Sequence, residues 1–158
     1  MKKQGFTLIE LMVVIVIMGI LAAVAVPKLF GMIAKSKASE VGPAAGEYVK
    51  LQDAYIAENG DWMGSFTDIG YEMGSTNVFT YTSSISAKSS LATKTGAWSA
   101  TSLSALNNCA KGKVWQLDLY QSSTGNGAAW EAKTNDDTNC LILTPRFADL
   151  TRGTKKGS

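Results

Sequence analysis

One long apolar stretch dominates the N-terminal part of the chain. Residues 11–27 carry no formal charge, and Thr7 and Glu10 are the main polar exceptions within residues 6–26. A helix that crosses a bilayer core needs roughly 20 predominantly apolar residues. Because so long an apolar stretch is unstable in water, it must contact lipid or protein. The pattern predicts a membrane-spanning helix over residues 6–27.

After Pro27 the pattern changes to the spacing of an amphipathic helix. Apolar residues recur at intervals of three, four and seven, which is the periodicity of one helix face. They are Phe30, Ala34, Val41, Ala44, Tyr48, Leu51 and Tyr55. The opposite face carries Lys35, Glu40, Glu47, Lys50 and Asp53. We expect this helix to cover residues 28–59 and to end at Asn59-Gly60, a typical helix stop.

Glycines and prolines weaken this helical region at two places. Pro27 lacks an N–H group and its ring clashes with the preceding turn, and Gly19 lies in the same apolar stretch. Gly42-Pro43 forms the second weak point. Each proline costs roughly 3 kcal/mol inside a helix. We therefore expect a kink near Pro27 and a kink or break near Gly42.

Residues 60–158 are rich in Gly, Ser, Thr and Asn, with short apolar pieces between them. We predict strands at residues 77–82, 113–120, 128–134 and 140–144. Within the second of these, Trp115, Leu117 and Leu119 alternate with polar residues, as in a half-buried strand. The polar stretches 122–127 and 135–139 are expected to be hairpin connections. Most of residues 83–104 is expected to be a surface loop, with a short strand at 97–101.

These patterns predict an α+β fold. A long N-terminal helical spine, kinked near Pro27 and Gly42-Pro43, packs on a small antiparallel β-sheet head that forms a meander. The head, residues 60–158, is large enough to build only a small core.

The charges around the apolar stretch set its orientation. Lys2 and Lys3 precede it, and basic residues favour the cytoplasmic side of a membrane, so the rest of the chain would lie outside. A cleaved secretory signal peptide is the alternative, since it also has a basic start and an apolar core. Glu10 and the length of the stretch favour a retained anchor.

Glu10 is the one carboxylate at the edge of the apolar stretch. A charged side chain inside a bilayer costs on the order of 2.5–3.5 kcal/mol. The helix dipole near the N-terminus offsets only about 0.3–1 kcal/mol of this cost. A cationic partner is therefore expected, with a side chain that reaches the headgroups as the alternative.

The composition offers little for catalysis. The chain contains no histidine, which excludes histidine-based triads and histidine-ligated metals. Asp136 and Asp137 do not have the spacing of an EF-hand loop, and we expect no metal site there. The basic tail at Arg152, Lys155 and Lys156 is expected to be solvated. The tryptophans, Trp62, Trp98, Trp115 and Trp130, are expected mainly in the core or at an interface.

The sequence Gly5-Phe6-Thr7-Leu8-Ile9-Glu10-Leu11-Met12-Val13-Val14 resembles the N-terminal signature of type IV prepilins and pseudopilins. Gly19, the alanine-rich residues 22–25 and Pro27 fit the same family. The resemblance covers about the first 35 residues. The remainder of the chain matches only the general plan of the family.

The resemblance implies a maturation pathway. A prepilin peptidase would remove residues 1–5 as a leader peptide by cleaving between Gly5 and Phe6, and would then methylate the new amine of Phe6. Glu10 would pair with that amine on a neighbouring subunit. Removal of Lys2 and Lys3 from the 15 basic residues would leave equal numbers of basic and acidic side chains. A formally neutral subunit can stack without accumulating repulsion. Pro27 would allow local melting of the helix in the fibre.

The two cysteines, Cys109 and Cys140, both lie in the part of the chain placed outside the cytoplasm. A disulfide is expected in that oxidising compartment, with two free thiols as the alternative. Many pilins have such a bridge near the C-terminus, where the loop that it closes often faces the fibre surface.

The resemblance further implies the major structural subunit of a type IV pilus, which is not an enzyme and needs no cofactor. Its partners would be its own copies in a helical fibre, the prepilin peptidase and pilus assembly machinery, and membrane lipid before assembly. Nucleic acid or carbohydrate binding is not indicated. The precursor would lie in the inner (cytoplasmic) membrane and the fibre on the cell surface. The alternatives are a type II secretion pseudopilin, which forms a short periplasmic pseudopilus, and a monomeric membrane-anchored binding module.

Overall fold

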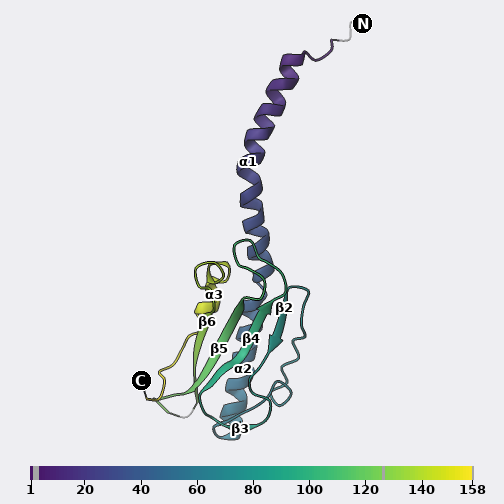
Figure 1. Ribbon diagram of the computed structural model, residues 1–158. Helices are drawn as coiled ribbons and strands as arrows, with labels where there is room; N and C mark the ends of the chain where they lie inside the picture. The colour runs from purple at the N-terminus through teal and green to yellow at the C-terminus, as the bar shows by residue number, and fades with distance from the viewer. Residues whose placement is uncertain (2–3, 126, 158) are drawn as a thin grey trace. The chain divides into compact units, whose positions relative to one another are not determined.

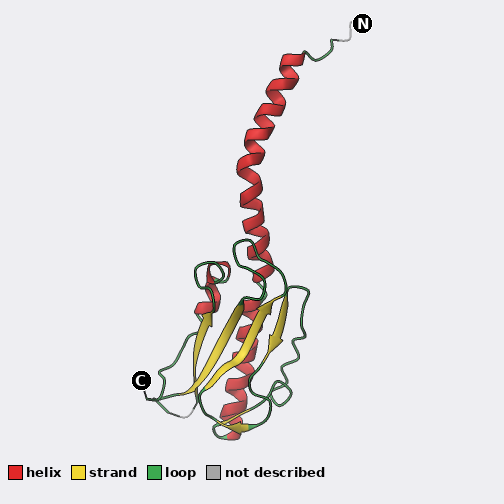
Figure 2. Cartoon of the chain, in the orientation of Figure 1, coloured by secondary structure: helices red, strands yellow, loops and turns green. Residues whose placement is uncertain are grey.

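The computed structural model describes residue 1 and residues 4–125 and 127–157. Lys2 and Lys3, on which the predicted membrane orientation rests, lie outside the described residues, as do Asn126 of the predicted 122–127 connection and Ser158. The chain divides into two compact units, residues 1–33 and 34–158. Figures 1 and 2 show the helices and strands that form them.

The first helix, α1 (Leu8–Ala38), confirms the helical prediction for the apolar stretch but begins two residues later than Phe6. It continues through Pro27 without ending there. Pro27 removes one backbone N–H donor from the helix. The residues on both sides of Pro27 nevertheless remain helical. Proline therefore does not break this helix.

The interruption of the helical region lies at Ser39 and Glu40, just before the predicted Gly42-Pro43 position. The second helix, α2 (Val41–Asn59), begins directly afterwards. Pro43 cannot donate to the carbonyl of Ser39 and its ring would clash with that group. In the first turn of a new helix, by contrast, a missing N–H costs nothing because that donor has no helical acceptor. Pro43 thus fixes the break upstream of itself.

Side chains of the head form hydrogen bonds to Glu40, at the interruption between α1 and α2. The Glu40 carboxylate accepts hydrogen bonds from Thr76 Oγ1 at 2.6 Å and from the Tyr81 hydroxyl at 2.9 Å. At its other end α2 stops at Gly60, which adopts a left-handed conformation with φ 63°. The predicted helix stop at Asn59-Gly60 is confirmed.

The buried face of the helices differs in part from the predicted stripe. Val41, Ala44 and Tyr48 are buried as expected. Phe30, however, is 59% exposed. Further along α2 the most deeply buried positions are Gln52 and Ile56, while the predicted Leu51 and Tyr55 are only half-buried.

The main sheet has four antiparallel strands in the order β2-β4-β5-β6. Its strands are β2 (Phe79–Thr82), β4 (Lys94–Ser102), β5 (Val114–Gln121) and β6 (Ala128–Thr134). A second, two-stranded sheet joins β1 (Trp62–Met63) to β3 (Ser89–Ser90). Figure 1 shows α2 lying along one face of the main sheet. Three of the predicted strands and the β5–β6 hairpin are confirmed, whereas the small sheet was not predicted.

Two predictions for the head are wrong. The predicted strand at residues 97–101 is confirmed, but it is part of the longer β4 between β2 and β5, with Ala97, Trp98 and Ala100 buried, so that half of residues 83–104 lies in strands and is not a surface loop. Residues 140–144 are not a strand, so the stretch 135–139 is not a hairpin connection. They lead instead into a 3₁₀ turn, η1 (Leu141–Leu143), and the short helix α3 (Pro145–Ala148).

The edge of the sheet explains the second error. The outer edge of β6 is already paired with the C-terminal segment, where Trp130 and Arg152 exchange backbone hydrogen bonds of 2.8 and 3.0 Å. No position beside β6 is therefore available at this point for residues 140–144. Pro145 occupies the first turn of α3, a position that proline favours.

Three buried tryptophans join the sheet to its surroundings. Trp98 donates its indole N–H to the Tyr71 hydroxyl at 2.9 Å, and Trp115 donates to Thr144 Oγ1 at 2.7 Å. Trp130 donates to Asp53 Oδ1 on α2 at 2.9 Å. The prediction that most tryptophans pack in the core is confirmed for these three, while Trp62 is 43% exposed.

Candidate assembly surface

The first unit presents an apolar helical surface with no covering layer of its own. The side chains of α1 before Gly31 are exposed in the chain, including Leu11 at 60%, Ile17 at 51% and Leu21 at 64%. By length and composition, the helical region Leu8–Asn59 contains a span able to cross a membrane. Exposed apolar surface on this scale requires lipid or protein around it.

The predicted cleavage position precedes this helix. Residues 4–7 have no regular secondary structure, and Phe6 is 93% exposed. Apart from Gly5 itself and its two chain neighbours, no residue has an atom within 4 Å of the position where Gly5 would carry a Cβ. A peptide bond in an exposed segment without regular secondary structure is open to a protease.

Thr7 and Glu10 form a reciprocal cap at the start of α1. Glu10 Oε2 accepts hydrogen bonds from the Thr7 backbone N–H at 2.8 Å and from Thr7 Oγ1 at 2.7 Å. In return the Glu10 backbone N–H donates to Thr7 Oγ1 at 3.3 Å. This arrangement is a capping box, which satisfies donors that the first helical turn leaves unpaired. Glu10 is therefore already hydrogen-bonded within its own chain.

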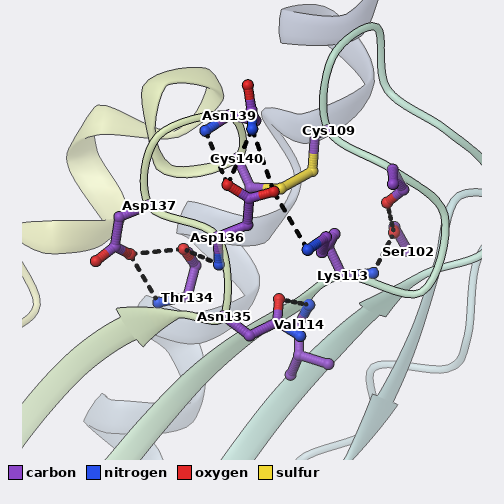
Figure 3. Close-up of polar contacts among 11 residues, drawn as sticks. Ser102, Cys109, Lys113, Val114, Thr134, Asn135, Asp136, Asp137, Asn139 and Cys140 are labelled. Atoms are coloured by element: carbon purple, nitrogen blue, oxygen red, sulfur yellow. Dashed lines mark hydrogen bonds and ion pairs between the residues drawn. A yellow bond between two sulfur atoms is a disulfide. The ribbon is translucent and has the colours of Figure 1, made fainter.

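In the second unit, Cys109 and Cys140 form the predicted disulfide. Both cysteines are fully buried. The bridge joins the connection between β4 and β5 to the segment before η1, as Figure 3 shows. The disulfide prediction is confirmed.

Polar contacts order the segment next to this disulfide (Figure 3). Asp136 pairs with Lys113, whose Nζ lies 3.2 Å from Oδ2, and accepts a hydrogen bond from the Asn139 backbone N–H at 3.2 Å. Burial raises the pKa of Asp136, but its bonds to Asn139 and Lys113 outweigh burial and lower that pKa. Asp137 accepts from Thr134 Oγ1 at 2.7 Å. These carboxylates serve internal contacts.

A second acidic site lies within the sheet. Asp118 on β5 is 1% exposed and accepts hydrogen bonds from the Gly96 N–H at 2.8 Å and from Gln116 Nε2 at 2.6 Å. It also forms an ion pair with Lys133 of β6. Burial raises the pKa of Asp118, but the hydrogen bonds from Lys133, Gln116 and Gly96 together lower it below its usual value.

The predicted site residues thus fall into four places. Gly5, Phe6 and Glu10 lie together at the start of α1, while Gly19 and Pro27 lie further along it. Gly42 and Pro43 lie in the first turn of α2, and the two cysteines are joined in the head. Among the residues that the structure describes, no group of three His, Cys, Asp or Glu side chains could hold a metal ion.

Comparison with known proteins decides the family. Residues 1–26 match the model of the prokaryotic N-terminal methylation motif. The chain is 35% identical over 144 residues to the type IV major pilin protein PilE1 of Neisseria gonorrhoeae, covering 86% of this chain and 82% of that protein. It is 34% identical over 128 residues to a fimbrial protein of Neisseria meningitidis serogroup B, covering 81% of this chain and 71% of that protein.

The chain is a type IV pilin. The fimbrial protein EcpC of Eikenella corrodens is also similar, with 29% identity over 147 residues that cover 92% of each chain. No solved structure matches the pilin significantly. The family consists of structural subunits and not of enzymes, as the sequence implied.

Sequence reasoning missed two contacts of this pilin, and a pattern could have revealed only the first of them. A threonine followed three residues later by glutamate, ahead of an apolar stretch, is the signature of a capping box. Gln52, an uncharged polar residue within α2, is fully buried. With its amide oriented to satisfy both groups, it donates to the Gly64 carbonyl at 3.2 Å and accepts from the Gly64 N–H at 3.1 Å. Only its position on the buried side of the helix pointed to that role.

Proposed function

We propose that this pilin is the major subunit of a type IV pilus and polymerises with its own copies into a helical surface fibre. It is inserted in the cytoplasmic membrane as a prepilin, cleaved between Gly5 and Phe6, and N-methylated at Phe6. The observation that carries the proposal is the uncovered apolar surface of α1, which begins with one carboxylate. That surface contacts lipid before assembly and the α1 helices of other subunits afterwards.

Glu10 guides the arrival of each subunit. Cleavage creates a positively charged amine at Phe6, and a neighbour's amine then reaches the Glu10 carboxylate of the subunit beside it. The bonds of the capping box go to Oε2, so Oε1 can accept from that amine while Thr7 keeps its own bonds. A charge-assisted hydrogen bond in an apolar environment fixes the position of the incoming helix.

Pro27 and Gly19 are the positions at which α1 adapts to its neighbours. Pro27 leaves one carbonyl of the preceding turn without its helical donor, so melting there costs less than elsewhere in the helix. We place the change between the membrane-inserted and the fibre-bound helix at these residues. The peptidase, a membrane platform and a cytoplasmic ATPase supply the steps that the subunit itself does not perform.

The proposal is tested on fibres sheared from cells. Mass spectrometry should find this chain as their main component, beginning with an N-methylated Phe6. Glu10→Ala should leave membrane insertion intact but lower the yield of sheared fibres about tenfold or more, because a charge-assisted bond is worth roughly 1.5–3 kcal/mol per contact. Glu72→Ala is the matched control, since Glu72 is an exposed residue of the head. Sheared fibres that lack this chain, or normal fibres from Glu10→Ala, would contradict the proposal.

A further inference from the structure

The charges of the pilin are separated along the chain although the mature subunit is formally neutral. Between Glu10 and Glu40 the sequence has three lysines, Lys28, Lys35 and Lys37, and no acidic residue. From residue 40 onward it has twelve acidic and ten basic residues, because only Glu10 and five basic residues come earlier. The three lysines are exposed, and none forms an ion pair with a carboxylate among the described residues.

The outward face of α2 carries more acidic than basic side chains, with Lys50 exposed on it as well as two glutamates. Glu47 and Glu58 are exposed on it, and neither takes part in an ion pair within the described part of the chain. Asp53 is already engaged by Trp130 and Arg152. This helix face, which the head leaves uncovered, thus offers two unengaged carboxylates to a basic partner.

We propose that the exposed face of α2 binds the lysine-bearing part of α1 from a second copy of this chain, with Lys28 and Lys35 paired to Glu47 and Glu58. The inference rests on the proposed function, since a fibre is what brings two copies together. In the proposed fibre, the apolar parts of α1 form the core. The lysine–glutamate pairs would add a polar contact outside the membrane-spanning segment. That contact would set how far each subunit is shifted along the fibre axis relative to its neighbour.

The helical positions of the four residues fit this pairing. Residues seven or eleven positions apart on a helix of 3.6 residues per turn point within about 20° of each other. Lys28 and Lys35 therefore share one face of α1, and Glu47 and Glu58 share one face of α2. At ~1.5 Å per residue the two spacings differ by about 6 Å, which the long lysine and glutamate side chains can divide between two pairs. Lys37 points to the opposite side of α1 from Lys28.

A second copy is a better occupant than a lipid surface. All copies enter the membrane in the same direction in the proposed pathway, so the helices of neighbours are parallel and the order of charges is preserved between them. Lipid headgroups would attract Lys28 and Lys35 but would leave Glu47 and Glu58 unpaired, and they carry no fixed spacing. A second copy of the chain, which carries both the lysines and the glutamates at these intervals, can pair the charged side chains of both α1 and α2.

Charge reversal tests the pairing. Lys28→Glu and Glu47→Lys should each lower the yield of sheared fibres about fivefold, since an attractive contact repeated in each subunit becomes repulsive. The double variant should restore the yield to within about twofold of the wild type, because reversed partners attract again. Lys35→Glu and Glu58→Lys form a second, independent pair. Lys37→Glu is the matched control and should leave the yield unchanged.

Cross-linking distinguishes contact between copies from other effects. Carbodiimide joins lysine and glutamate side chains that are in contact, so wild-type fibres should give covalent dimers whose linked peptides contain Lys28 and Glu47. Single reversals with normal yield, a double variant no better than the single ones, or dimers without these peptides would overturn the inference. A wild type without fibres would instead overturn the proposed function, and this inference with it. Membrane level and the Cys109–Cys140 disulfide report whether each variant has folded.

Discussion

At the scale of single residues, Asp118 shows how the small head tolerates a buried charge. The carboxylate receives donors from three strand residues, namely Gly96, Gln116 and Lys133. Gly96 has φ 66° and lies where the register between β4 and β5 shifts. A bulge leaves an N–H group unpaired, and here Asp118 accepts from it. The side chain thus stabilises an irregular point of the sheet.

Replacing this carboxylate should destabilise the head in a pH-dependent way. We expect Asp118→Asn to lower the free energy of unfolding by about 1–3 kcal/mol at pH 7, because Lys133 loses its partner and a buried network is disrupted. The folded-state pKa of Asp118 is lowered, so its contribution is present above the ordinary carboxyl pKa and is lost as pH falls through the lowered value. The difference between variant and wild type should therefore shrink below about pH 4.

Urea unfolding of the detergent-solubilised protein, followed by tryptophan fluorescence at pH 7 and pH 3, measures this difference. Asp149→Asn is the control, since Asp149 is an exposed aspartate outside the sheet. A difference that stayed constant or grew with acidification would contradict the role assigned to Asp118.

At the scale of elements, α2 and the segment after it contain glycines with opposite requirements. A Cβ added at Gly42 would meet no atom within 4 Å. A Cβ at Gly64 would lie 2.9 Å from Asp68 Cβ and 2.9 Å from Ile69 Cγ2. Of these two glycines, only Gly64 is therefore required by packing within the subunit.

Alanine at these two positions should have effects of opposite sign. Gly42→Ala should raise the free energy of unfolding by roughly 0.5–1 kcal/mol, because glycine loses more conformational entropy in a helix than alanine does. Gly64→Ala should lower it by about 1–3 kcal/mol through overpacking. Urea unfolding of the two variants beside the wild type measures both values. If both substitutions changed the free energy of unfolding by the same amount and in the same direction, the packing around one of the two glycines would differ from that described here.

The elements also show what the sequence could reveal. The strands β5 and β6 and the stop of α2 at Asn59 carry strong local signals, since alternation and an Asn-Gly pair depend only on near neighbours in the chain. The strand β4 carries a weak one, because Trp98 is the only large side chain among its four buried positions, the others being alanine and serine. Its place between two other strands is a tertiary property. The apolar residues 141–143 resembled a strand, but the edge of β6 at Trp130 is already paired with Arg152 and Pro145 favours the helical turn that follows them.

The functional residues divide in the same way. Roles for Gly5, Phe6 and Glu10 could be proposed because these residues lie close together in a specific motif. Asp118 and Gln52 could not, because their partners come from distant segments and no pattern marks them. Neither residue lies on the proposed assembly surface, so the omission concerned the stability of the head.

At the scale of the whole molecule, the disulfide closes a loop across a small domain. The two cysteines are 31 positions apart. A cross-link of this span limits the unfolded chain far more than the folded one, which chain-entropy arithmetic sets at about 3.5–4 kcal/mol. The head of this pilin has a small core, so that contribution is a large part of its stability.

Removal of the bridge should accordingly have a large effect on stability. The variant Cys109→Ser/Cys140→Ser should lose about 3–4 kcal/mol of unfolding free energy relative to the oxidised wild type. Wild-type protein unfolded in the presence of reductant should behave like the double variant. A loss below about 1 kcal/mol would indicate that the denatured head is already compact without the bridge.

The capping box at Thr7 and Glu10 has a consequence for the supply of subunits. The Thr7 N–H and hydroxyl groups already donate to the Glu10 carboxylate. In a membrane-inserted subunit, as proposed, this carboxylate would therefore not be an unpaired charge. If the precursor is membrane-inserted as proposed, unpolymerised subunits could therefore remain in the bilayer until they assemble. In the proposed fibre a neighbour's amine then adds a charge-assisted bond at Oε1 without breaking any bond of the cap, so that its stabilising effect is not offset by a lost contact within the subunit.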